Sequence, residues 1–454
     1  MGMALLIGQA RRPGGASQWW AQDPVGMLVA ALAIAMPIVA AILFPTYMHQ
    51  MPHPSWEWAR LLEMPFVALE VAVVLLANRR GMDIAAVWRS LPGDMKVAGV
   101  LLLIGLTVSS ALWSQKPAAS LLMSIITVFH LLFAASVFHL LRIAPPRYAS
   151  PFLGYHAIGL VLLALYTAWW FSFPPDPSSV MGGKIEWFNA LPGFISARQF
   201  GAWTGAIAAG FAVLILFEKP GSGKASPSLD WRHAAFFLAT GMTVWSGTRA
   251  AVLAIALAVV FFIIIRRELP ALTAIGRAAI LGGAATTIAW FLLPDSPAFY
   301  LYHPGELESL ESAGAGRIEL WSQTWDRWLA SPLFGWGTGS TFWEVDIGWA
   351  HTQPHNVVLQ FLISWGVVGA AGGLWILGRA IRAIPRAAFF DPGIAGLAAM
   401  LIALLLQSLV EGMLHYPRFI VSIVILFAIL IESGRRTATD DASHTGIDNP
   451  PEPA

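Results

Sequence analysis

A succession of apolar runs, each about as long as a bilayer is thick, constrains this chain more than any other feature. A helix that crosses the hydrocarbon core needs about 20 apolar residues, and such runs recur from residue 25 to residue 432. Charged residues make up only 12% of the chain, whereas soluble domains carry about 25%. A backbone in hydrocarbon must satisfy its hydrogen bonds within its own segment, so the runs are helices. The sequence predicts an all-α, polytopic integral membrane protein.

We expect about twelve transmembrane helices. Residues 1–293 hold the first nine, residues 294–355 form one long outer loop with short helices, residues 356–434 hold the last three, and residues 435–454 form a polar tail that is predicted to be disordered. The predicted spans are residues 25–44, 61–77, 97–113, 118–141, 152–172, 199–217, 233–246, 250–265, 276–293, 356–378, 393–410 and 419–432.

Lysine and arginine residues divide unevenly between the two sides that this threading creates. With the N-terminus inside, 19 of the 27 lie in inner segments and 8 lie in outer ones. Cytoplasmic loops of membrane proteins carry such an excess of positive charge. The distribution therefore predicts that the N- and C-termini are both cytoplasmic.

Two arginines stand at the outer ends of predicted spans. Arg198 lies in PGFISARQFG, and Arg249 lies in WSGTRAAV, between two apolar runs with almost no loop. A charge at such a depth is expected to face a wet cavity or an anion. For Arg198, a snorkelling side chain at the interface is an equal alternative. For Arg249 anion binding is favoured, because its small neighbours permit close approach and guanidinium groups bind phosphate in forked contacts.

Two histidines flank Pro354 immediately before the tenth predicted span. His351 and His355 belong to AHTQPHNVVLQF, and since a residue before proline avoids helical geometry, the helix is expected to start near Pro354 or His355. His355 would then lie in the first turn, at the outer edge of the membrane, where an imidazole can act as a general base. A capping histidine at the interface is the alternative, and Asn356 is typical of a helix start.

The long outer loop contains an amphipathic pattern, Arg317–Leu329, followed by the glycine-rich turn GWGTGS. Arg317 and Trp321 are four residues apart and share one helical face. With Asn356 they are candidate contacts to a donor or acceptor sugar, and packing within the loop is the alternative. The turn lacks the GK[ST] ending of a nucleotide-binding loop and follows no strand, so its glycines are interpreted as turn residues.

No metal site and no cofactor are predicted. The acidic residues Glu306, Glu308, Glu311 and Glu319 stand in a surface-like run of the long loop, where a solvated face is the favoured interpretation. The chain has no cysteine, which excludes disulfides, thiolate nucleophiles and Cys-ligated metals. The formal net charge of +1 gives no indication of a nucleic-acid partner, and none is predicted.

Carboxylates near the membrane suggest an alternative of a different class. Glu63 and Glu70 lie seven residues apart on one face of the second predicted span, and Glu411 and His415 lie near the eleventh. Such groups can form a proton relay, as in a secondary transporter. A transporter of this kind is expected to show paired broken helices in two halves, and the sequence shows no such symmetry.

Five segments together resemble the O-antigen ligase and polymerase superfamily of bacterial envelope proteins. Their order, the number of spans and the long outer loop agree with that family over nearly the whole chain. The segments are SALWSQKPAAS (110–120), FISARQFGAW (194–203), WSGTRAAVLAIALA (245–258), RIELWSQTWDRWLASPLFGWGTGSTF (317–342) and PHNVVLQFLISWGVVGAAGGL (354–374).

The resemblance implies an activity and a location. Members of this family work at the periplasmic face of the bacterial inner membrane, without a nucleotide sugar or an obligatory metal. They transfer a glycan from undecaprenyl diphosphate to lipid A–core in ligases, to another repeat unit in polymerases, or to a protein side chain in other relatives. We expect a metal-independent, inverting glycosyltransferase of the ligase type. Its partners would be the undecaprenyl-diphosphate-linked glycan, a lipid A–core or other glycan acceptor, and membrane lipids.

The resemblance also implies roles for particular residues. Matched by motif, Arg198 and Arg249 are expected to bind the diphosphate, and His355, the histidine of the family's HN motif, is expected to be the catalytic base. The loop 294–355 is then periplasmic and carries part of the active site. His351 is a second histidine close by and departs from the family pattern, so it stays open as the alternative base.

Overall fold

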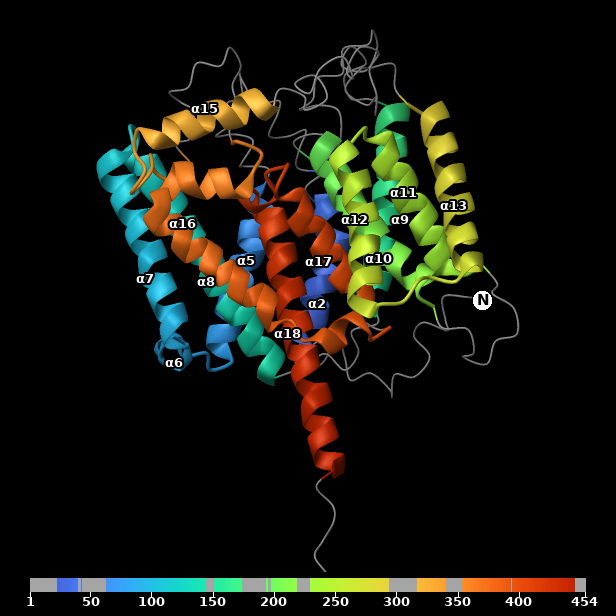
Figure 1. Cartoon of the computed structure of the whole chain (residues 1–454), viewed down its shortest axis with the longest axis horizontal. Coiled ribbons are helices and arrows are strands. Elements are labelled where there is room, and N and C mark those ends of the chain that lie inside the picture. Colours follow the sequence, from blue (N-terminus) through green and yellow to red (C-terminus); the bar gives the residue numbers. More distant parts are fainter. Residues whose placement is uncertain are drawn as a thin grey trace, which may run out of the picture.

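The computed structural model describes residues 23–39, 42, 63–143, 151–173, 193–194, 197–218, 229–293, 317–339, 353–392 and 394–445. These residues form helices and connecting turns, with no β-strand among them, and the helices stand side by side in one bundle (Figure 1). The predicted all-α class is confirmed.

The helices follow one another in the order of the predicted spans. They are α2 (Pro24–Ala30), η1 (Ala31–Ala35), α5 (Met64–Arg79), α6 (Ile84–Ser90), α7 (Gly93–Val108), η3 (Ser109–Trp113), α8 (Pro117–Ile143), α9 (Pro151–Ser172), α10 (Ala197–Leu216), α11 (Trp231–Trp245), α12 (Arg249–Arg266), α13 (Leu272–Phe291), α15 (Arg317–Leu329), α16 (Val357–Ala383), η6 (Arg386–Phe389), α17 (Ala395–Gln407), η7 (Met413–His415) and α18 (Pro417–Thr445).

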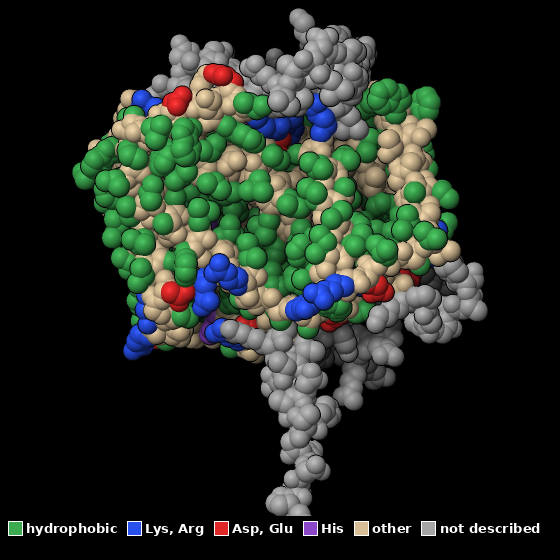
Figure 2. Space-filling model, in the orientation of Figure 1, with side chains coloured by type: hydrophobic (Ala, Val, Ile, Leu, Met, Phe, Trp, Pro, Cys, Tyr) green, Lys and Arg blue, Asp and Glu red, His purple; other side chains and the backbone are tan. Residues whose placement is uncertain are grey.

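Seven of these helices are long and apolar enough to cross a membrane. They are α7 with η3, α8, α9, α10, α12, α13 and α16, and the other five predicted spans also coincide with helices. Apolar side chains cover the middle of the bundle, whereas charged side chains gather above and below it (Figure 2). A charge in hydrocarbon is costly, so this band has the distribution expected of a surface that faces lipid. A polytopic membrane protein is therefore confirmed.

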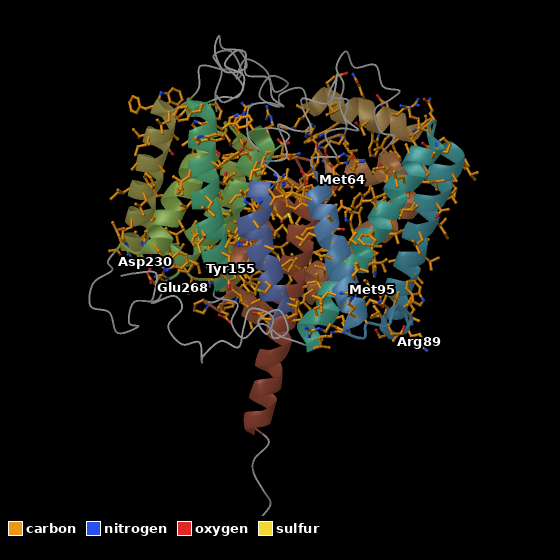
Figure 3. All side chains as sticks on the ribbon, turned by 180° about the vertical axis from the view of Figure 1, so that it is seen from behind. Met64, Arg89, Met95, Tyr155, Asp230 and Glu268 are labelled. Carbon is orange, nitrogen blue, oxygen red and sulfur yellow. The ribbon has the colours of Figure 1, made fainter. Side chains whose placement is uncertain are left out.

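The ends of the helices alternate as the predicted threading requires. Arg89, Tyr155, Asp230 and Glu268 all lie toward one end of the bundle, and Met64 lies toward the other (Figure 3). The first four come from segments that we expected on the inner side, or at its edge, whereas α5 begins at Met64 on the expected outer side. The labelled positions therefore agree with the predicted alternation of inner and outer segments.

The centre of the bundle is α10. In the most apolar stretch of α10, 94% of the residues are buried inside the protein, against 17% for the peripheral α13. Glycines allow neighbouring helices to approach α10 closely, because a side chain at Gly201 would overlap the turn before α12 and one at Gly210 would overlap α17. Small residues at helix contacts are the usual means of close packing in membranes. The start of α10, which carries Arg198, is thus held in a rigid position.

The tenth predicted span is broken. We expected one continuous helix over residues 356–378, but Gly366 has non-helical backbone angles (φ 61°, ψ −171°) and divides α16 into two parts. The first part lies across the upper end of the bundle and the second descends beside α7 (Figure 1). Angles of this kind are open to glycine and almost closed to other residues. The prediction of an unbroken span was wrong because periodicity does not report one residue's backbone angles.

The turn after α15 replaces the hydrogen bonds that this kink removes. In an unbroken helix the N–H groups of residues 367–368 would bond to the carbonyls of residues 363–364. Here they donate to the carbonyls of residues 332–333 at 2.8 and 3.2 Å. The carbonyls of residues 363–364 accept instead from the N–H groups of residues 336–337 at 2.8 and 3.0 Å. Because a buried backbone group must be paired, the turn and the kink stabilise each other.

A buried cluster of hydroxyl groups fixes the other side of the same turn. Ser124 Oγ lies 2.8 Å from Ser110 Oγ and 2.7 Å from Thr338 Oγ1, and Ser120 Oγ donates to Ser110 Oγ at 2.8 Å. Trp365 Nε1 donates to Thr338 Oγ1 at 2.9 Å. The glycine-rich turn therefore packs between η3, α8 and α16 and is hydrogen-bonded to them. This agrees with the interpretation of its glycines as turn residues.

One further element differs from expectation. The helix α18 runs to Thr445, so its backbone extends into the tail 435–454 that we expected to be disordered.

The replacement Gly366→Ala is expected to destabilise the protein, and Gly378→Ala in the same helix is its matched control. A Cβ at Gly366 would lie 2.2 Å from the backbone of Leu333, whereas one at Gly378 would meet nothing within 4 Å. We expect Gly366→Ala to cost about 2–3 kcal/mol or more, and Gly378→Ala to be neutral or mildly stabilising. Thermal unfolding in detergent measures both, and an equal Tm for the two variants would contradict the prediction.

Candidate functional site

A carboxylate that is almost fully buried lies among two arginine side chains and one histidine side chain at the upper end of the bundle. Glu411 lies between α17 and α18, and its side chain is 3% exposed. Arg317 donates a hydrogen bond to Glu411 Oε1, and His355 Nδ1 donates to Glu411 Oε2 at 3.1 Å. Arg198 Nη1 lies 4.0 Å from Glu411 Oε1. These four residues, Glu411, Arg198, Arg317 and His355, are called the Glu411 cluster below.

The members of the Glu411 cluster come from four separate elements. Arg198 is the second residue of α10, Arg317 is the first residue of α15, and His355 stands just before α16. In Figure 2 a group of basic side chains lies at this end, between α15 and the start of α12, with an acidic side chain among them. Only the tertiary structure brings these elements to one point.

Neutral hydrogen bonds hold the elements of the cluster in place. Trp321 Nε1, one turn after Arg317, donates to the carbonyl of Pro354 at 2.8 Å. Gln353 Nε2 donates to the hydroxyl of Tyr416 at 3.2 Å, and its side chain packs so closely on Gly412 that a Cβ there would overlap it. The segments 353–357 and 408–416 are thus fixed to each other on both sides of Glu411.

His355 does not lie in the first turn of a helix, as we had expected. The helix α16 starts at Val357, and Asn356 is its N-cap, whose side-chain oxygen accepts from the N–H groups of Val358 and Leu359 at 3.0 Å each. His355 precedes this cap and has a left-handed backbone, with φ 53°. The proline rule placed the boundary two or three residues too early, because the cap residue decides where the helix begins.

Asn356 therefore has a structural role. Besides capping α16, it donates from Nδ2 to the carbonyl of Leu409 at 3.0 Å. Its interpretation as a helix-start residue is confirmed, and these bonds account for both ends of its amide. Its role as a sugar contact stays a prediction.

Arg249 lies beside the Glu411 cluster at the start of α12. Thr248 Oγ1 donates to the carbonyl of Ala197, the neighbour of Arg198, at 3.3 Å. Gly247 has φ 67°, and Ser246 and Thr248 lie against Gly201, where a Cβ would come within 2.2 Å of both hydroxyl oxygens. The small residues before Arg249 thus permit the close approach that the sequence suggested. They place the first residue of α12 next to the first turn of α10.

Electrostatics keep the central carboxylate ionised. Burial by itself raises the pKa of Glu411, but the positive charge of Arg317, the hydrogen bond and charge of His355 and the charge of Arg198 outweigh it. Together they lower the pKa of Glu411 from 4.5 to about 2. An ionised carboxylate only accepts hydrogen bonds, so His355 Nδ1 carries a proton. In the neutral imidazole, Nε2 is then the basic nitrogen.

Most of the candidate residues predicted from the sequence lie close together in the structure. It brings Arg198, Arg317, Trp321 and His355 together, with Arg249 beside them, whereas His351 lies outside the described residues. Sequence reasoning did not find that Glu411 is the group these cations share. The available signal was a lone carboxylate in the apolar stretch LLLQSLVEGML, where a charge requires a partner.

The carboxylates that suggested a proton relay are paired with separate arginine or histidine side chains. Glu63 lies 3.4 Å from Arg418 Nη2, and Glu70 lies 2.8 Å from His130 Nδ1. The third, Glu411, belongs to the cluster described above. Among the described residues, no three His, Asp or Glu side chains are grouped as ligands of a metal ion.

The replacement Glu411→Gln is expected to destabilise the protein and to weaken its acid sensitivity. Because the pKa of Glu411 is lowered by folding, its contribution to stability is full above about pH 4.5 and is lost as the pH falls toward 2. Removing one partner of a buried ion pair costs about 3–5 kcal/mol. The three cations retain 17–28% exposure, so we expect a cost of up to about 3 kcal/mol at neutral pH.

Thermal unfolding in detergent across this pH range measures the effect. The variant Glu319→Gln, on the exposed face of α15, is the control and should match the wild type. If Glu411→Gln lost as much stability on acidification as the wild type, the assignment of the low pKa to Glu411 would be wrong.

Part of the chain matches a known protein family. Residues 234–374 match a protein-family model described as O-Antigen ligase. The matched segment includes Arg249, Arg317 and His355, whereas Arg198 and Glu411 lie outside it. No relative was found among curated proteins. The resemblance to the O-antigen ligase superfamily that the motifs predicted is confirmed over residues 234–374.

Proposed function

We propose that this protein transfers a glycan from undecaprenyl diphosphate to an acceptor sugar, in the first place lipid A–core, at the periplasmic face of the bacterial inner membrane. The family match supports an activity of the O-antigen ligase or polymerase type in general. The lipid-linked donor, the acceptor and the periplasmic location are parts of the proposal. So are the absence of a metal from the reaction and inversion at the anomeric carbon.

The observation that carries the proposal is the sharing of one carboxylate by two guanidinium groups. Arg317 and Arg198 both approach Glu411 Oε1, and Arg249 begins the adjacent helix. Guanidinium groups match the geometry of phosphate oxygens. At the edge of the hydrocarbon region, where the effective dielectric constant is low, they stabilise negative charge strongly. A diphosphate leaving group develops this charge, so the site suits its departure.

The geometry of His355 supports a role as general base. With Nδ1 bound to Glu411, Nε2 takes the proton from the acceptor hydroxyl. The acceptor oxygen then bonds to the anomeric carbon of the donor sugar while the bond from that carbon to the diphosphate oxygen breaks. The arginines bind the undecaprenyl diphosphate that leaves, and the proton on His355 passes to solvent or to this product. Glu411 orients the imidazole and stabilises its protonated form.

Three acceptors are compatible with this chemistry. A polymerase would use the terminal sugar of another lipid-linked repeat, and a protein O-oligosaccharyltransferase would use a side-chain hydroxyl. The ligase is favoured because the single long loop and its arginine pattern resemble that branch. A secondary transporter, the alternative from another class, is disfavoured because Glu63, Glu70 and Glu411 are each paired with a different arginine or histidine side chain.

Deletion of the gene in its host is expected to remove the glycan ladder from lipopolysaccharide while carrier-linked polymer accumulates. A core that bears one repeat unit would indicate a polymerase instead. An unchanged ladder would contradict both the ligase and the polymerase assignment and would favour protein glycosylation or transport. Gel electrophoresis of surface lipopolysaccharide distinguishes these outcomes.

The variants His355→Ala and Arg249→Ala, returned to the deletion strain, are expected to insert normally and to lose transfer. Loss of a general base or of a charge-stabilising donor costs roughly 10²–10⁴ in rate. Arg89→Ala, at the opposite end of the bundle, is the matched control and should restore the ladder. A functional His355→Ala together with an inactive His351→Ala would show that the base was assigned to the wrong histidine.

The purified enzyme is expected to invert the configuration of the transferred sugar. A single displacement with His355 as base leaves no covalent intermediate on the protein, so the donor and product linkages have opposite anomeric configurations. Nuclear magnetic resonance of the product from a donor of known configuration measures this. Retention, or a trapped glycosyl-enzyme, would exclude the mechanism.

A further inference from the structure

The helix α15 carries an apolar stripe that the rest of the protein leaves exposed. Ile318, Trp325 and Leu329 are 48%, 45% and 53% exposed. Successive residues of a helix are about 100° apart, so these three side chains lie within about 40° of one another. Three large apolar side chains on one strip of a helix require a partner or a non-aqueous environment.

The other two faces of α15 contact the rest of the protein and water, respectively. Leu320 and Thr324 are 3% and 1% exposed and pack into the protein. Glu319 and Asp326 are exposed and, seven residues apart, share a face of their own. The helix therefore presents one face to the bundle, one acidic face to water and the apolar stripe between them.

The stripe continues into a surface that faces lipid. Beyond α15, Leu333 is 61% exposed, and the ring of the next residue, Phe334, lies 5.6 Å from the ring of Trp113. Trp113 and Leu112, which are 42% and 72% exposed, end the membrane span formed by α7 and η3. Apolar side chains run from α15 onto α7, and acidic side chains lie on the upper edge of α15 (Figure 2).

The orientation of α15 fits the boundary of a bilayer. The helix lies across the upper end of the bundle and does not run alongside α7 (Figure 1). An amphipathic helix at an interface buries its apolar face about 5–10 Å into the headgroup and acyl region. Tryptophan is stable at this level, because its ring is apolar and its N–H is polar.

We infer that α15 lies in the plane of the membrane, with Ile318, Trp325 and Leu329 among the acyl chains of the leaflet next to the Glu411 cluster. Its partner on this face is the lipid bilayer, and Glu319 and Asp326 face water. The helix begins at Arg317, so the membrane sets the height at which this arginine meets Glu411. The inference depends on the exposure pattern of α15 and not on the proposed glycan transfer.

Site-directed spin labelling tests the inference, and the absence of cysteine from the chain allows one label at a time. The single variants Ile318→Cys, Trp325→Cys and Leu329→Cys report on the stripe. Glu319→Cys and Asp326→Cys are matched controls on the acidic face, and Leu112→Cys on η3 is the reference for lipid exposure. The full-length protein is measured in nanodiscs of phosphatidylethanolamine and phosphatidylglycerol, with oxygen and a water-soluble nickel chelate as relaxing agents.

The stripe labels are expected to be more accessible to oxygen than to the nickel chelate, as at position 112, and the acidic-face labels are expected to show the reverse. Stripe labels that are open to the nickel chelate would place α15 in water and overturn the inference. Stripe labels that are immobile and closed to both agents would indicate a protein partner and would also overturn it. Retention of a monodisperse elution profile shows that each labelled variant is folded.

Discussion

A carboxylate buried at the end of a membrane bundle must be paired, and the pairing of Glu411 organises the upper end of this protein. An isolated charge at such a depth is costly, so the fold needs cations from elsewhere in the chain. Arg198, Arg317 and His355 supply them from α10, α15 and the segment before α16. The same ion pairs that stabilise the fold also concentrate guanidinium groups where the proposed diphosphate would bind. The stability of the fold and the proposed function thus depend on the same side chains.

The break in α16 at Gly366 is a second constraint on the position of the Glu411 cluster. The break at Gly366 leaves backbone groups of α16 without helical partners, and the turn after α15 supplies them. Because this turn directly follows α15, the kink in α16 determines where α15 ends. Its other end is fixed by Arg317 on Glu411 and by Trp321 on Pro354. A helix anchored at both ends keeps Arg317 and Trp321 in a fixed position relative to α16.

The proposed reaction divides two tasks among the residues of the site. The arginines would stabilise the negative charge of the leaving diphosphate. His355 would take up and release the proton of the acceptor hydroxyl. The low pKa of Glu411 keeps its carboxylate ionised at neutral pH, so that the carboxylate accepts the hydrogen bond of the imidazole and orients it.

Periodicity, length and charge distribution were sufficient to predict most of the fold. Each of the twelve predicted spans coincides with a helix, and the amphipathic pattern at Arg317–Leu329 gives α15 with the same bounds. These features follow from local rules: apolar length determines a span, and residues four apart share a helical face. The motifs around Arg249 and His355 also indicated the family, and the match over residues 234–374 agrees with them.

The tertiary structure alone decided what the candidate residues contact. Glu411 and Arg317 are far apart in the sequence, and no local pattern encodes their ion pair. The break at Gly366 escaped prediction because glycine tolerates both helical and left-handed backbone angles, so the residue type does not reveal which is used. His355 lies outside α16 because the Asn356 cap, bound to Leu409 from another segment, sets the start of the helix. Local sequence determined the elements, and long-range pairing of buried polar groups determined how they meet.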